Sequence, residues 1–392
     1  MRNPVRLFTF VVAILCTGIA LPAPAWEHWG GDRGGSRFSP LNQITPDNVG
    51  NLVRAWEFRT GDLDARAPEV MKRTKFQATP LLVEDSLIFC SPFNEVIALD
   101  PGSGAQKWRY DPKISTNQRP ANRYNCRGVA YWVDDKATGT AACRARILVG
   151  TNDARVIALD ARSGAPCADF GANGEIKLDT GMPLEWPGEF QITSAPVIAR
   201  DTVIVGSAIA DNRRVEAPPG TVRAFDARTG RPRWSFDPLV HDGINAGHAN
   251  VWAPMSVDEE RGLVFLPTSS PSPDFWGGKR PGNNDYANSV VALRAETGER
   301  VWSYQTVHHD VWDYDLPAAD AGAHRHRRRP ARRRDPADQA GICVRARPRY
   351  RQAGMAGGGT RRAARRRRRR AAFADAAVSD PCAGAAVAAD FV

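Results

Sequence analysis

Short apolar runs followed by turn-forming residues dominate the chain. Val203–Val205 and Gly262–Leu266 are two such runs, and the period of an amphipathic helix is nearly absent. Runs of this length between turn signals are typical of antiparallel strands. The pattern therefore predicts an all-β fold.

One turn-centred motif recurs four times, at intervals of roughly 60 to 70 residues. In each copy an apolar strand end enters a turn that contains Gly, and in three copies the next strand opens on a Trp. The spacing leaves room for about four strands in each repeat, which is the content of one β-propeller blade. A β-sandwich array is the alternative. The copies begin at Ala98, Ala158, Ala224 and Ala292.

Charge changes this picture at one end of the chain only. The 392 residues carry a formal net charge of +10, but residues 319–392 alone hold 19 Arg and six Asp, without Lys or Glu, and residues 1–318 are mildly acidic at −3. A basic balance confined to one segment is not a surface field for nucleic acid. We therefore expect no nucleic-acid partner.

The first 25 residues have the pattern of a cleaved secretory signal. Arg2 and Arg6 precede an apolar stretch over Leu7–Leu21, and Ala23–Ala25 supplies small residues before Trp26. An uncleaved anchor is the alternative, although the apolar stretch is short for a bilayer. The expected location of the mature chain is the periplasm, with no spanning helix after cleavage.

Export permits disulfides among four cysteines of the body. Three pairings are open, and the order along the chain favours the two nearest-neighbour pairs over the alternative of free buried thiols. The lack of a CxxC motif argues against structural zinc. The favoured pairs are Cys90 with Cys126 and Cys143 with Cys167.

Four motifs carry a family resemblance. They are WGGDRGGSRFSPL at 29–41, CRGV at 126–129, WAPMS at 252–256 and VHHDVWDYDLP at 307–317. Over about residues 26–317 the chain resembles the pyrroloquinoline quinone-dependent dehydrogenases, and most closely their glucose, quinate and shikimate branch. The resemblance implies an eight-bladed quinoprotein β-propeller, here truncated to about four to five blades. It also implies oxidation of a sugar or cyclic polyol, with electrons passing to ubiquinone or another respiratory acceptor and membrane association left open.

The resemblance assigns roles to particular residues. Trp252 matches the floor on which the planar quinone lies, because a tricyclic anion needs a large π surface beneath it and cations at its carboxylates. Positions that hydrogen-bond the cofactor are matched by Gln77, Arg127 and Thr193.

A divalent cation, usually calcium, lies beside the quinone in this family. Asp211 and Asn212 match its ligands, and Ser270 stands where some members have Asn; Asp-Asn is also a common turn pair without a ligand. Asp313 matches both a metal neighbour and the general base that takes the alcohol proton. His308–Asp310 is interpreted as site wall, because adjacent residues of a strand point to opposite faces.

Residues 318–392 have the low-complexity composition of GC-rich DNA translated out of frame. Read one base later, the codons allowed for Arg345–Ala356 can encode Val-Leu-Asp-Arg-Asp-Thr-Gly-Lys-Pro-Val-Trp, which is the blade repeat again. We expect a frameshift after Pro317, a disordered tail and an inactive chain; a functional basic arm is the alternative. For the body, a non-catalytic envelope propeller scaffold is the alternative function.

Overall fold

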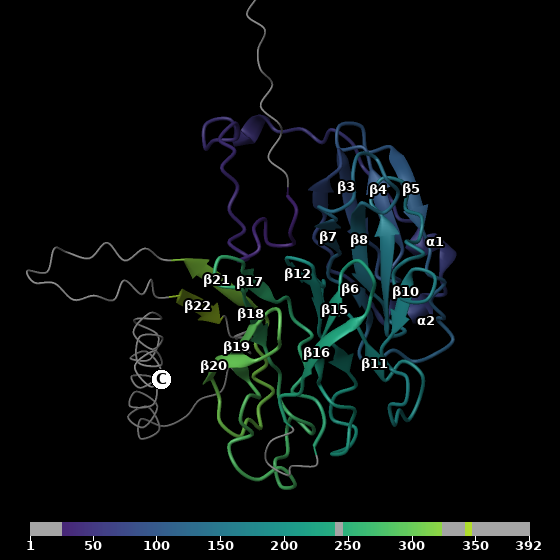
Figure 1. Cartoon of the computed structure of the whole chain (residues 1–392). Coiled ribbons are helices and arrows are strands. Elements are labelled where there is room, and N and C mark those ends of the chain that lie inside the picture. Colours follow the sequence, from purple (N-terminus) through teal and green to yellow (C-terminus); the bar gives the residue numbers. More distant parts are fainter. Residues whose placement is uncertain (1–25, 240–245, 324–341, 347–392) are drawn as a thin grey trace, which may run out of the picture.

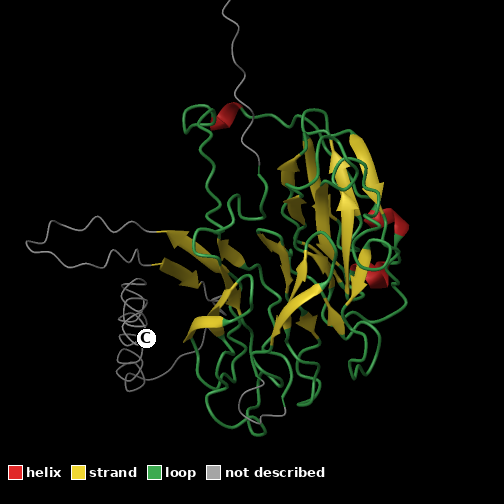
Figure 2. Cartoon of the chain, viewed as in Figure 1, coloured by secondary structure: helices red, strands yellow, loops and turns green. Residues whose placement is uncertain are grey.

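The computed structural model describes residues 26–239, 246–323 and 342–346. Within them four antiparallel sheets of four strands succeed one another along the chain, and the strands of each sheet are paired in sequence order. Figure 2 shows that strands and loops make up most of the described part and that its helices are short. These sheets are the predicted blades, and the all-β prediction is confirmed. The signal residues 1–25 lie outside the described part.

The strand boundaries follow the apolar runs of the sequence. Blade one holds β2 (Leu81–Val83), β3 (Ser86–Cys90), β4 (Val96–Leu99) and β5 (Gln106–Tyr110). Blade two holds β7 (Ala130–Val133), β8 (Ala145–Gly150), β9 (Arg155–Asp160) and β10 (Glu175–Lys177). Blade three holds β12 (Val197–Ala199), β13 (Thr202–Val205), β15 (Val222–Asp226) and β16 (Pro232–Phe236). Blade four holds β17 (Ser256–Asp258), β18 (Leu263–Pro267), β19 (Ser289–Arg294) and β20 (Arg300–Gln305).

The remaining elements are short. Figure 1 labels α1 (Asp62–Ala65) and α2 (Pro68–Met71), and a 3₁₀ turn covers Val49–Asn51. Two small sheets pair β1 (Thr74–Phe76) with β6 (Tyr124–Cys126) and β11 (Phe190–Gln191) with β14 (Ala208–Ile209). No helix in the described ranges has the length and apolar character needed to cross a bilayer.

Two strands fall inside the segment for which disorder is expected. β21 (Ala319–Ala323) pairs antiparallel with β22 (Ile342–Ala346), and β21 contacts β17 and β18 of blade four. The rest of that segment, 324–341 and 347–392, lies outside the described residues. Leu316 and Ala319 are buried in a cluster with Phe265 of β18, so apolar packing on blade four continues past Pro317.

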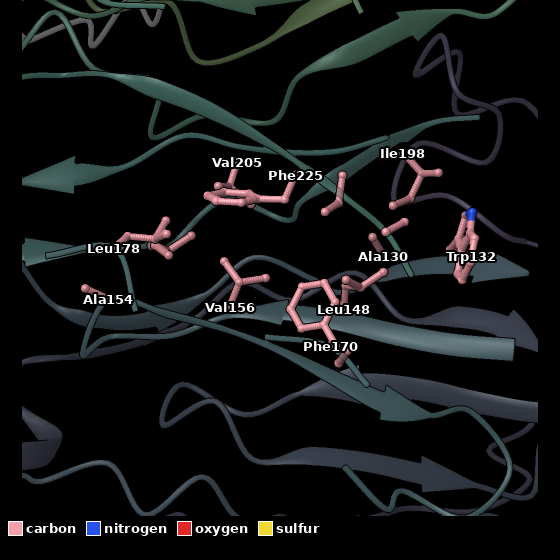
Figure 3. Packing of buried hydrophobic residues seen from close by; sticks show 14 of the residues in the cluster. Ala130, Trp132, Leu148, Ala154, Val156, Phe170, Leu178, Ile198, Val205 and Phe225 are labelled. Atoms are coloured by element: carbon pink, nitrogen blue, oxygen red, sulfur yellow. The ribbon is translucent and has the colours of Figure 1, made fainter. Parts of the chain in front are cut away.

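Each pair of neighbouring blades encloses its own apolar core. Leu148 and Val156 of blade two pack with Ile198, Val205 and Phe225 of blade three, as Figure 3 shows. Similar clusters lie between blades one and two and between blades three and four. Burial of both sheet faces explains why so many strands are apolar at consecutive positions rather than at alternate ones.

The Trp of the repeat docks on the turn of the next blade. Trp108 Nε1 donates to Ala161 O at 3.2 Å, and Trp234 Nε1 donates to Ala295 O at 3.0 Å. A Cβ on Gly164 or Gly298 would lie 2.5 or 2.7 Å from the indole of Trp108 or Trp234 respectively, and both glycines have positive φ. The Gly and the Trp of the repeat are therefore one packing unit shared between two blades.

Both disulfides have the pairing favoured by the chain order. Cys90 is bonded to Cys126 and Cys143 to Cys167. The first disulfide joins β3 of blade one to β6. It therefore holds the end of β6, directly before Arg127, against blade one.

Candidate functional site

The four residues expected at the cofactor occupy equivalent places in four successive blades. Each lies three or four positions before the first strand of its blade, that is before β2, β7, β12 or β17. The strands β7, β12 and β17 contact one another in this order. The residues gathered at this end of the first strands are Gln77, Arg127, Thr193 and Trp252.

Hydrogen bonds connect three of these segments around the site. Thr79 N donates to Arg127 O at 3.2 Å, and Arg127 N donates to Thr193 O at 3.0 Å. The Arg127 guanidinium also donates to Thr193 Oγ1 at 2.6 Å, and Thr193 is buried. Gln77 is exposed, and its Oε1 accepts a bond from Asn125 Nδ2 at 2.6 Å. Backbone hydrogen bonds thus hold the Arg127 segment between the segments of Thr79 and Thr193.

Trp252 lies between a cation and a carboxylate. The Arg127 guanidinium carbon is 4.8 Å from the centroid of the Trp252 ring. The indole Nε1 donates to Asp315 Oδ2 at 2.7 Å. An aromatic plane beside a guanidinium fits a planar anionic group such as a quinone carboxylate. Because Arg127 covers one face of the indole, such a group must take the other face or move the guanidinium aside.

The segment 310–315 brings several carboxylates to this floor. Asp315 Oδ1 accepts the Ser270 N–H at 2.8 Å, so Asp315 joins Ser270 to Trp252. Asp310 is buried, and its Oδ2 accepts the Ser270 hydroxyl at 2.6 Å. Asp313 lies between these two residues with an exposed side chain and a φ of 59°.

The acidic groups of the site shift one another's titration. The pKa of Asp313 is raised to about 7, chiefly by loss of hydration and then by the charges of the neighbouring carboxylates Asp315, Asp274, Asp211 and Asp310. Loss of hydration also raises the pKa of Asp211 to about 7, with Asp274 and Asp315 adding to the shift and His248 opposing it. Both carboxylates keep an exposed surface, so their removal from water is incomplete.

The pKa of Asp315 is also raised, and this residue is more deeply buried than Asp313. Burial raises its pKa to about 6, against the hydrogen bonds from Ser270 and Trp252, which lower it. Asp211, Asp313 and Asp315 thus lie close enough for their charges to repel one another, in addition to the effect of lost hydration. A bound cation would relieve that repulsion, so the donor set suits a hard metal ion.

The expected metal ligands are only partly arranged for coordination. Asn212 Nδ2 donates to Asp274 Oδ2 at 2.8 Å, and Asn212 Oδ1 accepts the Asp274 N–H at 2.9 Å. Asn288 Oδ1 is a buried oxygen that has no hydrogen-bond partner among the residues that the structure describes. Among the described residues, no group of three or more His, Cys, Asp or Glu side chains is positioned to hold a metal.

Three further polar residues belong to this site. Asp274 holds Asn212, Asn288 Nδ2 donates to Ser270 Oγ at 2.8 Å, and Asp315 holds Trp252. The second Asp of the Asp-Tyr-Asp sequence was a visible signal for Asp315. Asp274 and Asn288 have no such signal, because they stand in loops without a distinctive motif.

The triplet that resembles a metal-ligand set does not converge. His308 is exposed, the half-buried His309 has its Nδ1 2.8 Å from Gly282 O, and Asp310 is buried. A cavity of about 500 Å³ lies against blade one, beside Trp56, Phe58 and Phe89, and none of the expected site residues lines it.

Comparison with known families identifies related proteins. Residues 26–327 match the family model described as "PQQ: Glucose/ethanol/alcohol dehydrogenase, beta-propeller domain". The quinoprotein glucose dehydrogenase of Escherichia coli K12 is 40% identical over an alignment of 307 residues that covers 75% of this chain and 38% of the relative. The quinate/shikimate dehydrogenase (quinone) of Acinetobacter baylyi is 41% identical over an alignment of 318 residues that covers 74% of this chain and 38% of the relative.

Solved structures show the same fold. The quinohemoprotein alcohol dehydrogenase of Comamonas testosteroni superposes with a TM-score of 0.60 at 27% identity, over 76% of this chain and 44% of that chain. A europium-containing methanol dehydrogenase gives a TM-score of 0.61 at 25% identity, over 77% of this chain and 52% of that chain. The chain thus spans about two-fifths of the length of the curated relatives it matches.

Proposed function

Because the chain belongs to the glucose/ethanol/alcohol dehydrogenase β-propeller family, we propose that it carries cofactor-facing residues of a quinoprotein dehydrogenase. The substrate class is an alcohol group of a sugar or cyclic polyol, as the names of the glucose and quinate/shikimate relatives suggest. The observation that supports this proposal best is the continuous contact from Thr193 through Arg127 and Trp252 to Asp315.

The chain's residues divide into two groups around the cofactor. Pyrroloquinoline quinone supplies the hydride-accepting chemistry when it is bound. Trp252 would support its ring, while Arg127, Thr193 and Gln77 would hold its carboxylates and carbonyl oxygens by the donors that they present. An anionic tricycle suits this pair of an aromatic face and a guanidinium.

On the acidic side, Asp313 would act as the base. Its carboxylate is exposed and could therefore take the hydroxyl proton of a substrate, and a base with a pKa near neutrality suits that task. Calcium or another divalent cation would be held by oxygens of Asp211, Asn212, Ser270 and Asp313. Asn212 Oδ1 already accepts one backbone bond, and an amide oxygen has a second lone pair for the cation.

The cellular setting is part of the proposal. Two disulfides suit an oxidising compartment, which agrees with the signal pattern and a periplasmic location. Ubiquinone or another respiratory acceptor would take the electrons. The scaffold alternative has less support, because a scaffold needs neither a cation-covered indole nor a cluster of carboxylates with raised pKa values.

The test compares two proteins. One is the 392-residue chain, and the other is made from a gene whose frame is restored after Pro317. Each is mixed with pyrroloquinoline quinone and calcium, and dye reduction is measured with glucose, quinate and shikimate. We expect turnover with at least one substrate in the restored protein only, and no turnover when the cofactor is omitted. A restored protein that folds, binds the quinone and reduces no dye with any of them would contradict the proposed function.

A further inference from the structure

Asp310 is the most highly bonded carboxylate near the site, and the mechanism above does not use it. Its side chain is 1% exposed. Oδ1 accepts the Trp312 N–H at 3.0 Å, and Oδ2 accepts the Tyr314 N–H at 2.7 Å. These two amides flank Asp313 in the chain, so one carboxylate closes the turn on both sides of that residue.

Asp310 is itself fixed from blade four. Oδ2 also accepts Ser270 Oγ at 2.6 Å and Asn288 Nδ2 at 3.1 Å. Its carbonyl oxygen accepts a bond from the fully buried Arg280 guanidinium at 2.5 Å. The turn is therefore attached to the body of the protein through Asp310.

The turn needs such support because its backbone is unusual. Asp313 has a φ of 59°, in the left-handed region that residues with a Cβ seldom adopt, and Trp312 and Tyr314 are largely exposed. Packing of these two aromatic side chains therefore does little to hold the conformation. A backbone conformation of this kind persists only where the surroundings determine it.

We propose that Asp310 is a positioning residue: by binding the amides on either side of Asp313, it sets where the Asp313 carboxylate points. The link to catalysis rests on the proposed function, in which Asp313 is the base. Asp310 touches neither substrate nor cofactor in this scheme. A displacement of the turn by about 1 Å is enough to lower a rate strongly when a base must meet one proton.

The first test follows the turn itself in the 392-residue chain and needs no activity. Amide hydrogen exchange is measured for Trp312 and Tyr314 in wild type, Asp310→Asn and Asp258→Asn. Asp258 is a matched control, because its carboxylate also accepts a nearby backbone N–H, that of Arg261 at 2.9 Å, in a turn of blade four. We expect exchange at Trp312 and Tyr314 to become about tenfold faster or more in Asp310→Asn alone.

The second test uses the frame-restored protein. Asp310→Asn is expected to lower kcat by about tenfold or more, with kcat calculated from the concentration of enzyme that has bound the quinone, while the substrate KM stays nearly unchanged. This normalisation is needed because a general loss of folded protein also lowers the apparent kcat at constant KM. Unchanged exchange at both amides in a folded Asp310→Asn chain would overturn the proposal. If that variant does not fold, Asp310→Glu is used instead, because it keeps a carboxylate but displaces it by one methylene. Wild-type exchange rates at Trp312 and Tyr314 in Asp310→Glu would then overturn the proposal. An inactive wild-type restored protein would count against the proposed function only, since the exchange result stands independently.

Discussion

The indole of Trp252 and the carboxylate of Asp315 are joined by a 2.7 Å hydrogen bond across 63 residues of sequence. This bond connects the segment that enters blade four to the acidic segment that leaves it. Asp315 also accepts the Ser270 N–H, so the aromatic floor and the turn that holds Asp313 share one anchor. A movement of the Trp252 indole would therefore be transmitted to the turn that holds Asp313, and the reverse.

Removal of the indole should weaken cofactor binding. In the frame-restored protein, Trp252→Ala is expected to raise the Kd for pyrroloquinoline quinone by about tenfold or more, because stacking and the Asp315 bond are both lost. Trp252→Phe should raise the Kd by a smaller factor than Trp252→Ala, since an aromatic ring remains for stacking. The Kd is measured by equilibrium titration. Trp302→Phe is the control, because Trp302 packs on Phe265 in blade four; an equal loss there would show that the effect is not local.

Docking of Trp on Gly should contribute measurably to stability. In Gly298→Ala, the new Cβ would lie 2.7 Å from Trp234 Cδ2 at a φ of +74°. Gly262→Ala has a similar φ of +64° and no atom within 4 Å of the Cβ position, so it reports backbone strain alone. Urea unfolding should show Gly298→Ala to be less stable than Gly262→Ala by about 1 to 3 kcal/mol. If both variants lost the same free energy of unfolding, the contact between the new Cβ and the Trp234 indole could relax without cost.

The ion pair between blades two and three should make stability depend on acid. Arg228 donates two hydrogen bonds to Asp134. These bonds are the largest cause that lowers the pKa of Asp134 from 3.8 to about 2, with the Arg228 charge and the backbone N–H groups of Lys136 and Ala137 adding to the shift. Since the folded-state pKa is the lower one, the contribution is present above pH 4 and is lost as the pH falls towards 2.

The measurement is urea unfolding at pH 6 and pH 3. At pH 6, Asp134→Asn should be less stable than wild type by roughly 1 to 2 kcal/mol, and the gap should narrow at pH 3. The stability difference between Arg228→Gln and wild type should also be smaller at pH 3 than at pH 6, because this variant removes the other partner of the ion pair. A gap that stays constant between the two pH values would contradict the linkage.

The disulfide within blade two should stabilise that blade. Cys143 and Cys167 are 24 residues apart in sequence, and their bond joins the segment before β8 to the segment after β9. Replacing both by Ala should lower the free energy of unfolding by about 2 to 4 kcal/mol under non-reducing conditions. The same substitution should have little effect when the wild type is also reduced. A full effect in reducing buffer would point to lost packing instead of a lost cross-link.

Much of the fold could be predicted from local sequence. The repeated turn and its Gly belong to one short stretch that every blade repeats, and three of the four copies add a Trp. Trp108 and Trp234 dock on the turn of the next blade. The pattern thus predicted the strands and the spacing of the blades. The cysteine order likewise predicted both pairs, because sequence neighbours in a row of blades are also neighbours in space.

The polar contacts of the site were decided only by the tertiary structure. Asn212 bonds Asp274, Asp315 bonds Trp252, and Asp310 bonds Ser270, across 62, 63 and 40 residues respectively. No local pattern fixes such pairs, because each depends on how loops from different strands of the blades meet. The family resemblance implied that carboxylates lie near Trp252, whereas only packing of the blades determined which carboxylate bonds the indole, which one holds the turn and which one is left exposed.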